Sequence, residues 1–164
     1  MQLPANVPFG YIAFPPAYWY RPTYDFPGKV GFDWFTYVFP TFAAIGVGAA
    51  NQQQLIIQND SDFECRRIVF HMDLAAAAYT TSTQPMPNVT ALIVDSGSGR
   101  QLMSAAVPLA SIATLEGQPP VDLPWPKIFI RNSTISLTLT NFDAAVATAN
   151  FRVSLQGRKI FPLD

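Results

Sequence analysis

The chain has 164 residues, of which 49% are hydrophobic and only 13% are charged, and its formal net charge is −1. This length suits one domain with a substantial core, and the high hydrophobicity excludes an intrinsically disordered chain. Ordinary globular domains carry about 25% charged residues, so this chain has too few charges to solvate its whole surface, which favours a subunit covered by neighbours. The sequence lacks a Lys/Arg run, which argues against nucleic-acid binding and against an electrostatic membrane anchor.

Residues 1–44 are rich in both proline and aromatic residues. Proline at this density forbids a continuous helix and disfavours central strands, so we expect an extended N-terminal arm. Large aromatic rings bury much apolar area when covered, so we expect the arm to lie on its own domain or on a neighbouring subunit. The residues predicted to bind a partner in this way are Phe9, Tyr11, Phe14, Tyr18, Trp19, Tyr20, Tyr24 and Phe26.

Two further features of this first part concern the membrane and secretion. The most apolar stretch, residues 35–50, is interrupted by Pro40, Gly46 and Gly48 and is too short to span a bilayer comfortably. The first residues lack the basic and apolar regions of a secretory signal. We therefore expect a protein that is made in the cytoplasm and has no membrane partner.

Residues 45–164 are predicted to form an all-β domain, an antiparallel β-sandwich of jelly-roll-like type. Short apolar or alternating segments recur there, separated by Gly, Pro, Asn and Ser. In chain order, strands are expected at Gln54–Gln58, Phe63–Leu74, Asn88–Asp95, Lys127–Ile130, Ile135–Thr140 and Phe151–Gln156. Between them, Ser96–Gly99 is expected to turn a hairpin that returns through Arg100–Leu102, and Leu109–Leu115 to form a turn or two of helix. Gly157 is expected to break or bulge the last strand.

Strand alternation also predicts which side chains of Phe63–Leu74 face the same way. A period of two puts the odd-numbered residues, among them Cys65 and Arg67, on one face. It puts the even-numbered residues, among them Glu64 and Arg66, on the other.

The chain contains one cysteine and one histidine, Cys65 and His71. An intrachain disulfide or a cysteine metal cluster is therefore excluded, and any mechanism that needs two histidines is excluded as well. Cys65 is expected to be a small buried hydrophobe and His71 a packed histidine with one satisfied nitrogen.

Asp60, Asp62 and Glu64 alternate along the chain, which raises the alternative of a calcium site. Calcium needs six to eight oxygen ligands from a tightly turned loop, usually with a glycine, and no glycine is present here. Solvated turn residues are the favoured interpretation, with Glu64 pairing to Arg66 or Arg67.

Other catalytic patterns fail on spacing. The segment Ser96–Arg100 lacks the Gly and Lys positions of a phosphate-binding loop, and it lacks the downstream histidine that a serine nucleophile requires. The spacing of the acidic residues does not indicate the pair of carboxylates that a glycosidase needs. We therefore predict a protein without catalytic residues, cofactor or metal.

Four short segments follow recognisable motifs. Gln58–Arg66 is similar to a strand opening written dSDFewr, and Val94–Leu102 is similar to a D-x-x-S/T-G-R-x-L hairpin. Leu123–Phe129 resembles a P-f-P-x-x-i/f segment before a strand, and Val153–Phe161 resembles v-x-L-x-G-x-K-x-f. Together these segments resemble motifs of small virion proteins of tailed bacteriophages. The resemblance covers about residues 52–162 and leaves out the arm.

The resemblance implies a β-sandwich structural subunit of the phage particle that performs no catalysis. The leading interpretation is a capsid decoration (cement) protein, a homo-oligomer that uses its arm to bind the major capsid protein or other virion proteins. A neck, connector or tail protein of the virion is the alternative within this class. A carbohydrate-binding β-sandwich is the alternative from another class, and it requires Tyr18, Trp19 and Tyr20 to be exposed in the isolated domain.

Overall fold

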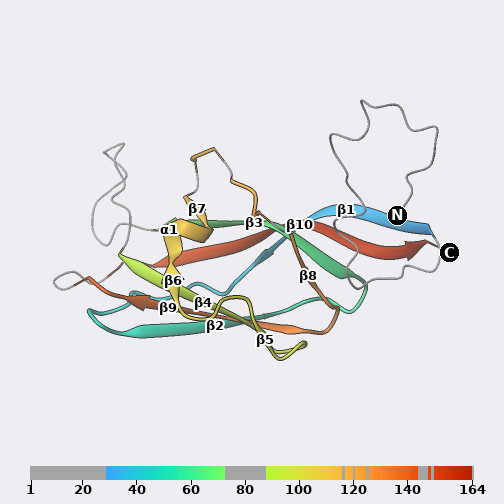
Figure 1. Cartoon of the computed structure of the whole chain (residues 1–164). Helices are drawn as coiled ribbons and strands as arrows, with labels where there is room; N and C mark the ends of the chain where they lie inside the picture. Colours follow the sequence, from blue (N-terminus) through green and yellow to red (C-terminus); the bar gives the residue numbers. More distant parts are fainter. Residues whose placement is uncertain are drawn as a thin grey trace, which may run out of the picture.

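The computed structural model of the chain describes residues 29–72, 88–115, 117–119, 121–124, 126–143, 148 and 150–163. This part is nearly all β, and its strands form two sheets that lie one above the other (Figure 1). The prediction of an all-β chain with two mostly antiparallel sheets is confirmed.

The elements follow one another along the chain with short connections. They are β1 (Lys29–Val38), β2 (Ala50–Ile56), β3 (Asp62–Met72), β4 (Val89–Asp95), β5 (Arg100–Gln101), β6 (Val107–Pro108), α1 (Leu109–Ile112), β7 (Thr114–Leu115), β8 (Lys127–Phe129), β9 (Thr134–Asn141) and β10 (Phe151–Leu163).

The first sheet, the upper layer in Figure 1, has the order β1-β10-β3-β7, and β8 also pairs with β3. The second sheet, the lower layer, has the order β2-β9-β4-β5, and β6 also pairs with β4. All pairings are antiparallel except the two-residue contact of β3 with β7. In Figure 1, β1 and β10 run on beyond the ends of β2 and β9, so one end of the first sheet projects from the sandwich.

The core lies between the sheets and draws on both. Alternate residues of β9 point inward, so that Ile135, Leu137 and Leu139 are almost completely buried. They meet phenylalanines of the other layer and of its connections, chiefly Phe63, Phe70, Phe129, Phe151 and Phe42. This apolar burial is the main source of the sandwich's stability.

The expected strands are present, with small differences at their ends. The hairpin of Ser96–Gly99 is a turn between β4 and β5, and the short helix α1 lies within Leu109–Leu115. Gly157 marks a bulge, and the strand continues past it as β10 to Leu163 instead of ending there.

The start of the sheet differs from the expected arm of residues 1–44. Residues 29–38 form β1, which pairs with β10 over ten consecutive positions, from Lys29 opposite Leu163 to Val38 opposite Ser154. Its end and the following turn then enter the core through Tyr37, Phe39 and Phe42. Proline did not prevent this strand because Lys29–Val38 itself contains none.

The predicted facing of β3 is correct up to Arg66 and wrong from Arg67 on. The pairing with β10 shifts by one residue, with Gly157 opposite Cys65 and Gln156 opposite Arg67, so that Arg66 is an extra residue. A bulge of this kind changes the phase of alternation. Cys65 and Ile68 therefore both face the core, while Arg66 and Arg67 are both half-buried on the outer side.

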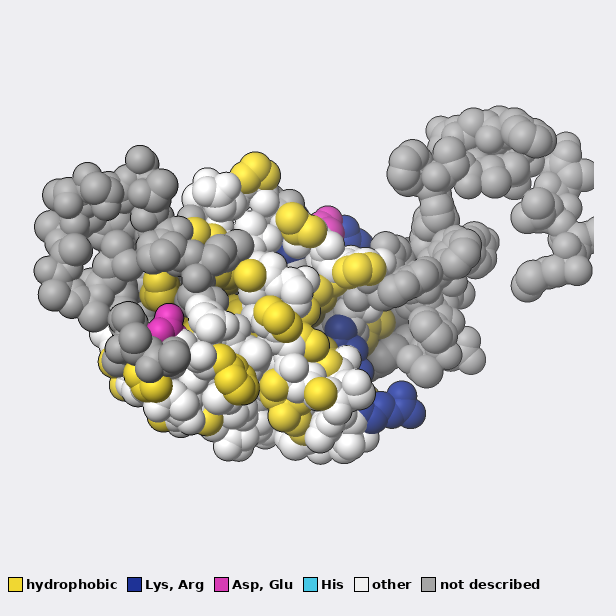
Figure 2. All heavy atoms as spheres, turned by 60° about the vertical axis from the view of Figure 1, so that its left-hand side comes forward, with side chains coloured by type: hydrophobic (Ala, Val, Ile, Leu, Met, Phe, Trp, Pro, Cys, Tyr) yellow, Lys and Arg dark blue, Asp and Glu magenta, His cyan; other side chains and the backbone are white. Residues whose placement is uncertain are grey.

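The face turned forward in Figure 2 is mostly uncharged and hydrophobic, with Lys and Arg mainly toward one side. Within the described part, no helix has the length and apolar character needed to cross a bilayer.

Candidate functional site

The eight aromatic residues predicted to bind a partner all belong to residues 1–28 and lie outside the described part of the chain. The first strand that is described, β1, continues their aromatic character. Its outward-facing residues include Phe32, which is 47% exposed, and Trp34, which is 59% exposed. Exposed aromatic side chains of this size on a regular sheet suggest a surface that contacts another molecule.

Three arginines surround these rings on the outer side of the first sheet. We call this surface the aromatic–arginine face and define it by Phe32, Trp34, Glu64, Arg66, Arg67 and Arg158. The register of the sheet assembles it: Trp34 of β1 lies opposite Arg158 of β10, which lies opposite Glu64 of β3. Trp34, Glu64 and Arg158 are separated by 30 to 124 positions in the sequence, yet they lie side by side in one cross-strand row.

Glu64 holds two of these arginines. Arg66 donates from Nε to Glu64 Oε1 at 2.7 Å, and Arg158 donates from Nη2 to Glu64 Oε2 at 2.8 Å. The glutamate side chain is 2% exposed, whereas the two arginine side chains are 35% and 30% exposed. Both carboxylate oxygens are thus used for holding guanidinium groups, which fixes the arginines while leaving part of each open to solvent.

Two of the three guanidinium groups, those of Arg158 and Arg67, lie over the aromatic rings. The Arg158 guanidinium carbon is 4.1 Å from the centroid of Phe32, and that of Arg67 is 5.4 Å from the centroid of Trp34. Both distances lie within the range of cation–π attraction. Arg67 also lies 3.1 Å from the exposed carboxylate of Asp122, but its Nε makes no hydrogen bond, so this contact is purely electrostatic.

The bulge between β3 and β10 creates this arrangement. At Gly157 a Cβ would lie 1.9 Å from the carbonyl oxygen of Glu64, so only glycine permits the backbones to approach this closely. The extra residue, Arg66, turns its own carbonyl away from β10, and this carbonyl accepts a hydrogen bond from Leu123 N–H. The loop that carries Asp122 is thereby attached beside the face.

A second polar group lies on the inner side, at the same end of the first sheet. Lys159 is only 8% exposed, and its Nζ donates to Gln58 at 2.5 Å and to Asp60 at 2.7 Å while lying 4.3 Å from the Phe35 ring centroid. The hydrogen bond from Lys159 holds the pKa of the Asp60 carboxyl below its usual range. These groups satisfy one another, so we assign them a structural role.

The hairpin of Ser96–Gly99 is organised by Asp95, which is 1% exposed. Asp95 Oδ1 accepts the Gly97 N–H at 3.1 Å, and Oδ2 accepts the Ser98 hydroxyl at 2.6 Å, while Lys127 lies 3.8 Å away. An aspartate that accepts hydrogen bonds from the residues after it is typical of a turn. The hairpin is therefore a structural loop.

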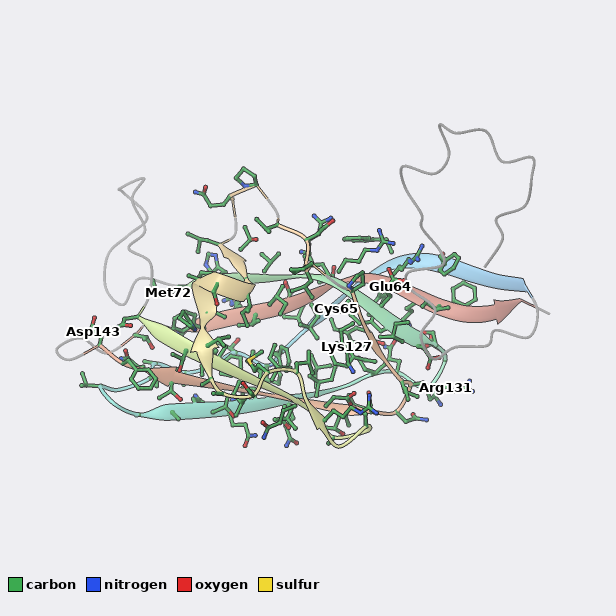
Figure 3. All side chains as sticks on the ribbon, viewed as in Figure 1. Glu64, Cys65, Met72, Lys127, Arg131 and Asp143 are labelled. Carbon is green, nitrogen blue, oxygen red and sulfur yellow. The ribbon has the colours of Figure 1, made fainter. Side chains whose placement is uncertain are left out.

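The other residues considered in the sequence do not come together. Cys65 lies between the layers (Figure 3), where burial raises the pKa of its thiol to about 12. His71 is half-buried on β3. Asp60 binds Lys159, while Asp62 accepts the Arg131 N–H at 2.9 Å. Among the described residues, no three of His, Cys, Asp and Glu are grouped as metal ligands would be.

The aromatic–arginine face has the composition of a binding surface. It offers rigid rings, three guanidinium groups and one already paired carboxylate, and rings and arginines are typical of the central residues of protein interfaces. The sequence predicted that Glu64 pairs with Arg66 or Arg67, and the structure shows the pairing with Arg66. The sequence analysis did not identify Phe32, Trp34 and Arg158 as residues of this surface. Two features of the sequence could have indicated them: the alternation of aromatic residues before Val38 and the glycine at position 157.

Comparison of the chain with protein-family models, curated proteins and solved structures finds no match.

Proposed function

We propose that the chain is a non-enzymatic structural subunit of a bacteriophage particle, a capsid decoration protein that acts by binding neighbouring virion proteins. The observation that carries this proposal is the aromatic–arginine face, with Trp34 59% exposed beside arginines held by a buried glutamate. Trp and Arg are the residues on which binding energy most often concentrates in protein interfaces. A side chain already held in place loses little entropy on binding.

The resemblance of four segments to phage virion proteins supports the same function. In the fold, residues of these segments contact one another: Glu64 pairs with Arg158, Asp60 with Lys159, and Asp95 with Lys127. The motifs thus describe one set of contacts within the two-sheet sandwich. In this proposal, the aromatic residues of the arm, Phe9 to Phe26, extend the binding surface onto a neighbouring subunit.

A neck, connector or tail location is the second candidate within the virion. Quantitative mass spectrometry of purified particles separates the two by copy number. Hundreds of copies per particle support capsid decoration, whereas about six or twelve copies support a neck or tail position and contradict the decoration role.

Binding to particles tests the face itself. Trp34→Ala in the full chain is expected to weaken binding to particles that lack this protein by at least about tenfold, because a central interface tryptophan contributes roughly 2 kcal/mol or more. The matched control is Phe142→Ala, since Phe142 is also 59% exposed but lies at the end of β9 in the other sheet. Equal binding by both variants would contradict a role of the aromatic–arginine face in attachment.

Carbohydrate binding is the candidate from another class, and it is supported by the two exposed rings on a regular sheet, Phe32 and Trp34. Sugars stack on aromatic faces that are open in the isolated domain. Binding of the isolated chain to a glycan array, abolished by Trp34→Ala, would support this function. Particle binding without glycan binding would support the structural one.

A further inference from the structure

Two long strands, β1 and β2, lie at sheet edges in the described part of the chain, and of these only β2 contains no charged residue. β2 pairs with β9 over seven consecutive residues, from Ala50 opposite Thr140 to Ile56 opposite Thr134. On its other side it pairs with no described strand. An edge of this kind presents unpaired N–H and C=O groups to any strand that approaches it.

The hydrogen bonds show which residues present these groups. The Asn141 N–H donates to the Ala49 carbonyl, and the Ile57 N–H donates to the Ser133 carbonyl, so odd-numbered residues are bonded to β9. In an antiparallel ladder the direction of the backbone groups alternates with each residue. Ala50, Gln52, Gln54 and Ile56 therefore direct their N–H and C=O groups outward.

The other sheet edges of the described part carry features that discourage pairing. β1, at the edge of the first sheet, contains Lys29 and Asp33. The opposite edges are formed by β5, β6 and β7 of two residues each and by β8 of three. β2 has none of these features, since Ala-Asn-Gln-Gln-Gln-Leu-Ile contains no charge and no proline, and its register with β9 has no bulge.

We propose that β2 pairs with β2 of a second copy of this chain about a two-fold axis at Gln53, which joins the second sheets of the two copies into one. In this register Gln52 lies opposite Gln54 of the other copy, and Ala50 lies opposite Ile56. These pairs are all even-numbered, as the outward direction of their backbone groups requires. All seven residues of each strand take part.

The side chains identify a second copy as the partner. Gln52, Gln54 and Ile56 are exposed on the outer face of the sheet, and Ile56 is 65% exposed. In the two-fold register each Ile56 packs against Ala50 of the other copy, and each Gln52 lies opposite Gln54. A glutamine amide is both a donor and an acceptor, so two such amides can bond to each other. β2 contains no charged residue, so two identical strands pair without electrostatic repulsion.

Sedimentation velocity of the full chain over a range of concentrations tests this pairing without any particle. The wild-type chain is expected to be a dimer, and Gln52→Lys with Gln54→Lys is expected to weaken dimerisation at least about tenfold, because lysines then lie opposite lysines. The matched control is Thr138→Lys, since Thr138 lies beside Gln52 on the central strand β9 and away from the edge. Circular dichroism verifies that each variant is folded.

Two further measurements fix the partner and the register. Mixing the double lysine variant with Gln52→Glu and Gln54→Glu is expected to restore a mixed dimer. Gln53→Cys is expected to form a disulfide between copies on oxidation, because residues facing each other at this non-hydrogen-bonded position have Cα atoms about 4.5 Å apart. Gln52→Cys, which faces Gln54 instead of itself, is the control for random cross-linking.

A wild-type chain that is monomeric at every concentration overturns the proposal, whether another segment occupies the edge or it stays open. A dimer that survives the lysine substitutions also overturns it, because another surface then holds the copies together. Neither result bears on attachment through the aromatic–arginine face, which the particle-binding experiment tests separately.

Discussion

Glu64 is the residue on which the candidate surface most depends. Its buried carboxylate is held between guanidinium groups from β3 and β10 that lie on either side of the bulge. Removing one member of such a group leaves the remaining charges without their partner, which costs more than the loss of an exposed pair.

Glu64→Gln is therefore expected to lower the free energy of unfolding by about 1–3 kcal/mol. The loss is limited to this range because the arginines are partly exposed and recover some hydration. Chemical denaturation measures this change. The control is Asp122→Asn, whose carboxylate is 62% exposed beside Arg67 and whose loss is expected to cost less than about 0.5 kcal/mol. Equal effects of the two variants would mean that the Glu64 pairs stabilise no more than a surface pair does.

Cys65 is expected to be chemically inert in the folded protein. It is 1% exposed, its thiol donates to the Arg67 carbonyl, and burial raises its pKa to about 12. Since the thiolate is the reactive form, we expect no labelling by a thiol reagent in the native state and complete labelling in concentrated guanidinium chloride. Rapid labelling under native conditions would show that β3 opens readily at this position.

At the scale of elements, the pairing of β3 with β10 decides the shape of the first sheet. The bulge shifts the phase of alternation, so that the part of β3 before it and the part after it both bury apolar side chains. It also places consecutive arginines on the same side. The bulge depends on the close approach of the two backbones at one residue, Gly157.

Gly157→Ala is expected to destabilise the fold by at least about 2 kcal/mol, because the new Cβ would overlap the Glu64 carbonyl and separate the strands. The control is Gly46→Ala, where the nearest atom to a new Cβ is the Ala49 side chain at 3.9 Å. That change is expected to alter stability by less than about 1 kcal/mol. Thermal melts of both variants compare the two, and a tolerated alanine at 157 would contradict the assigned bulge geometry.

At the scale of the whole molecule, the sandwich already includes β1, upstream of the predicted start at residue 45. β1 is the partner of β10 along ten positions, and the residues after it bring Phe39 and Phe42 into the core. A chain that starts at Ala43 would lose this strand and both rings. The large loss of buried apolar area would outweigh the net stability of a domain of this size.

A chain of residues 29–164 is therefore expected to fold cooperatively, whereas a chain of residues 43–164 is not. Circular dichroism and thermal unfolding distinguish them. We expect residues 29–164 to bind particles more weakly than the full chain, because they lack the aromatic residues predicted to contact neighbouring subunits. A folded chain of residues 43–164 would show that β1 adds to the sheet without being required for it.

The sequence by itself determined the all-β class and most of the strands. In Ile135–Thr140 the alternation of apolar and hydroxyl residues is a local property, and it corresponds to the buried and outward residues of β9. The Ser-Gly-Ser-Gly turn is equally local, since its conformation follows from glycine and from the preceding aspartate. Glu64 and Arg66 are near neighbours in sequence, and their pairing was predicted for that reason.

The tertiary structure alone decided the phase of β3, the place of β1 and the make-up of the aromatic–arginine face. The bulge at Arg66 follows from the register with a strand more than 80 residues away, as in the pairing of Val69 with Ser154. Arg158 reaches Glu64 across 94 residues, and Trp34 joins them only because β1 pairs with β10. Local propensity cannot specify such contacts, because their energy arises only when distant strands are brought side by side.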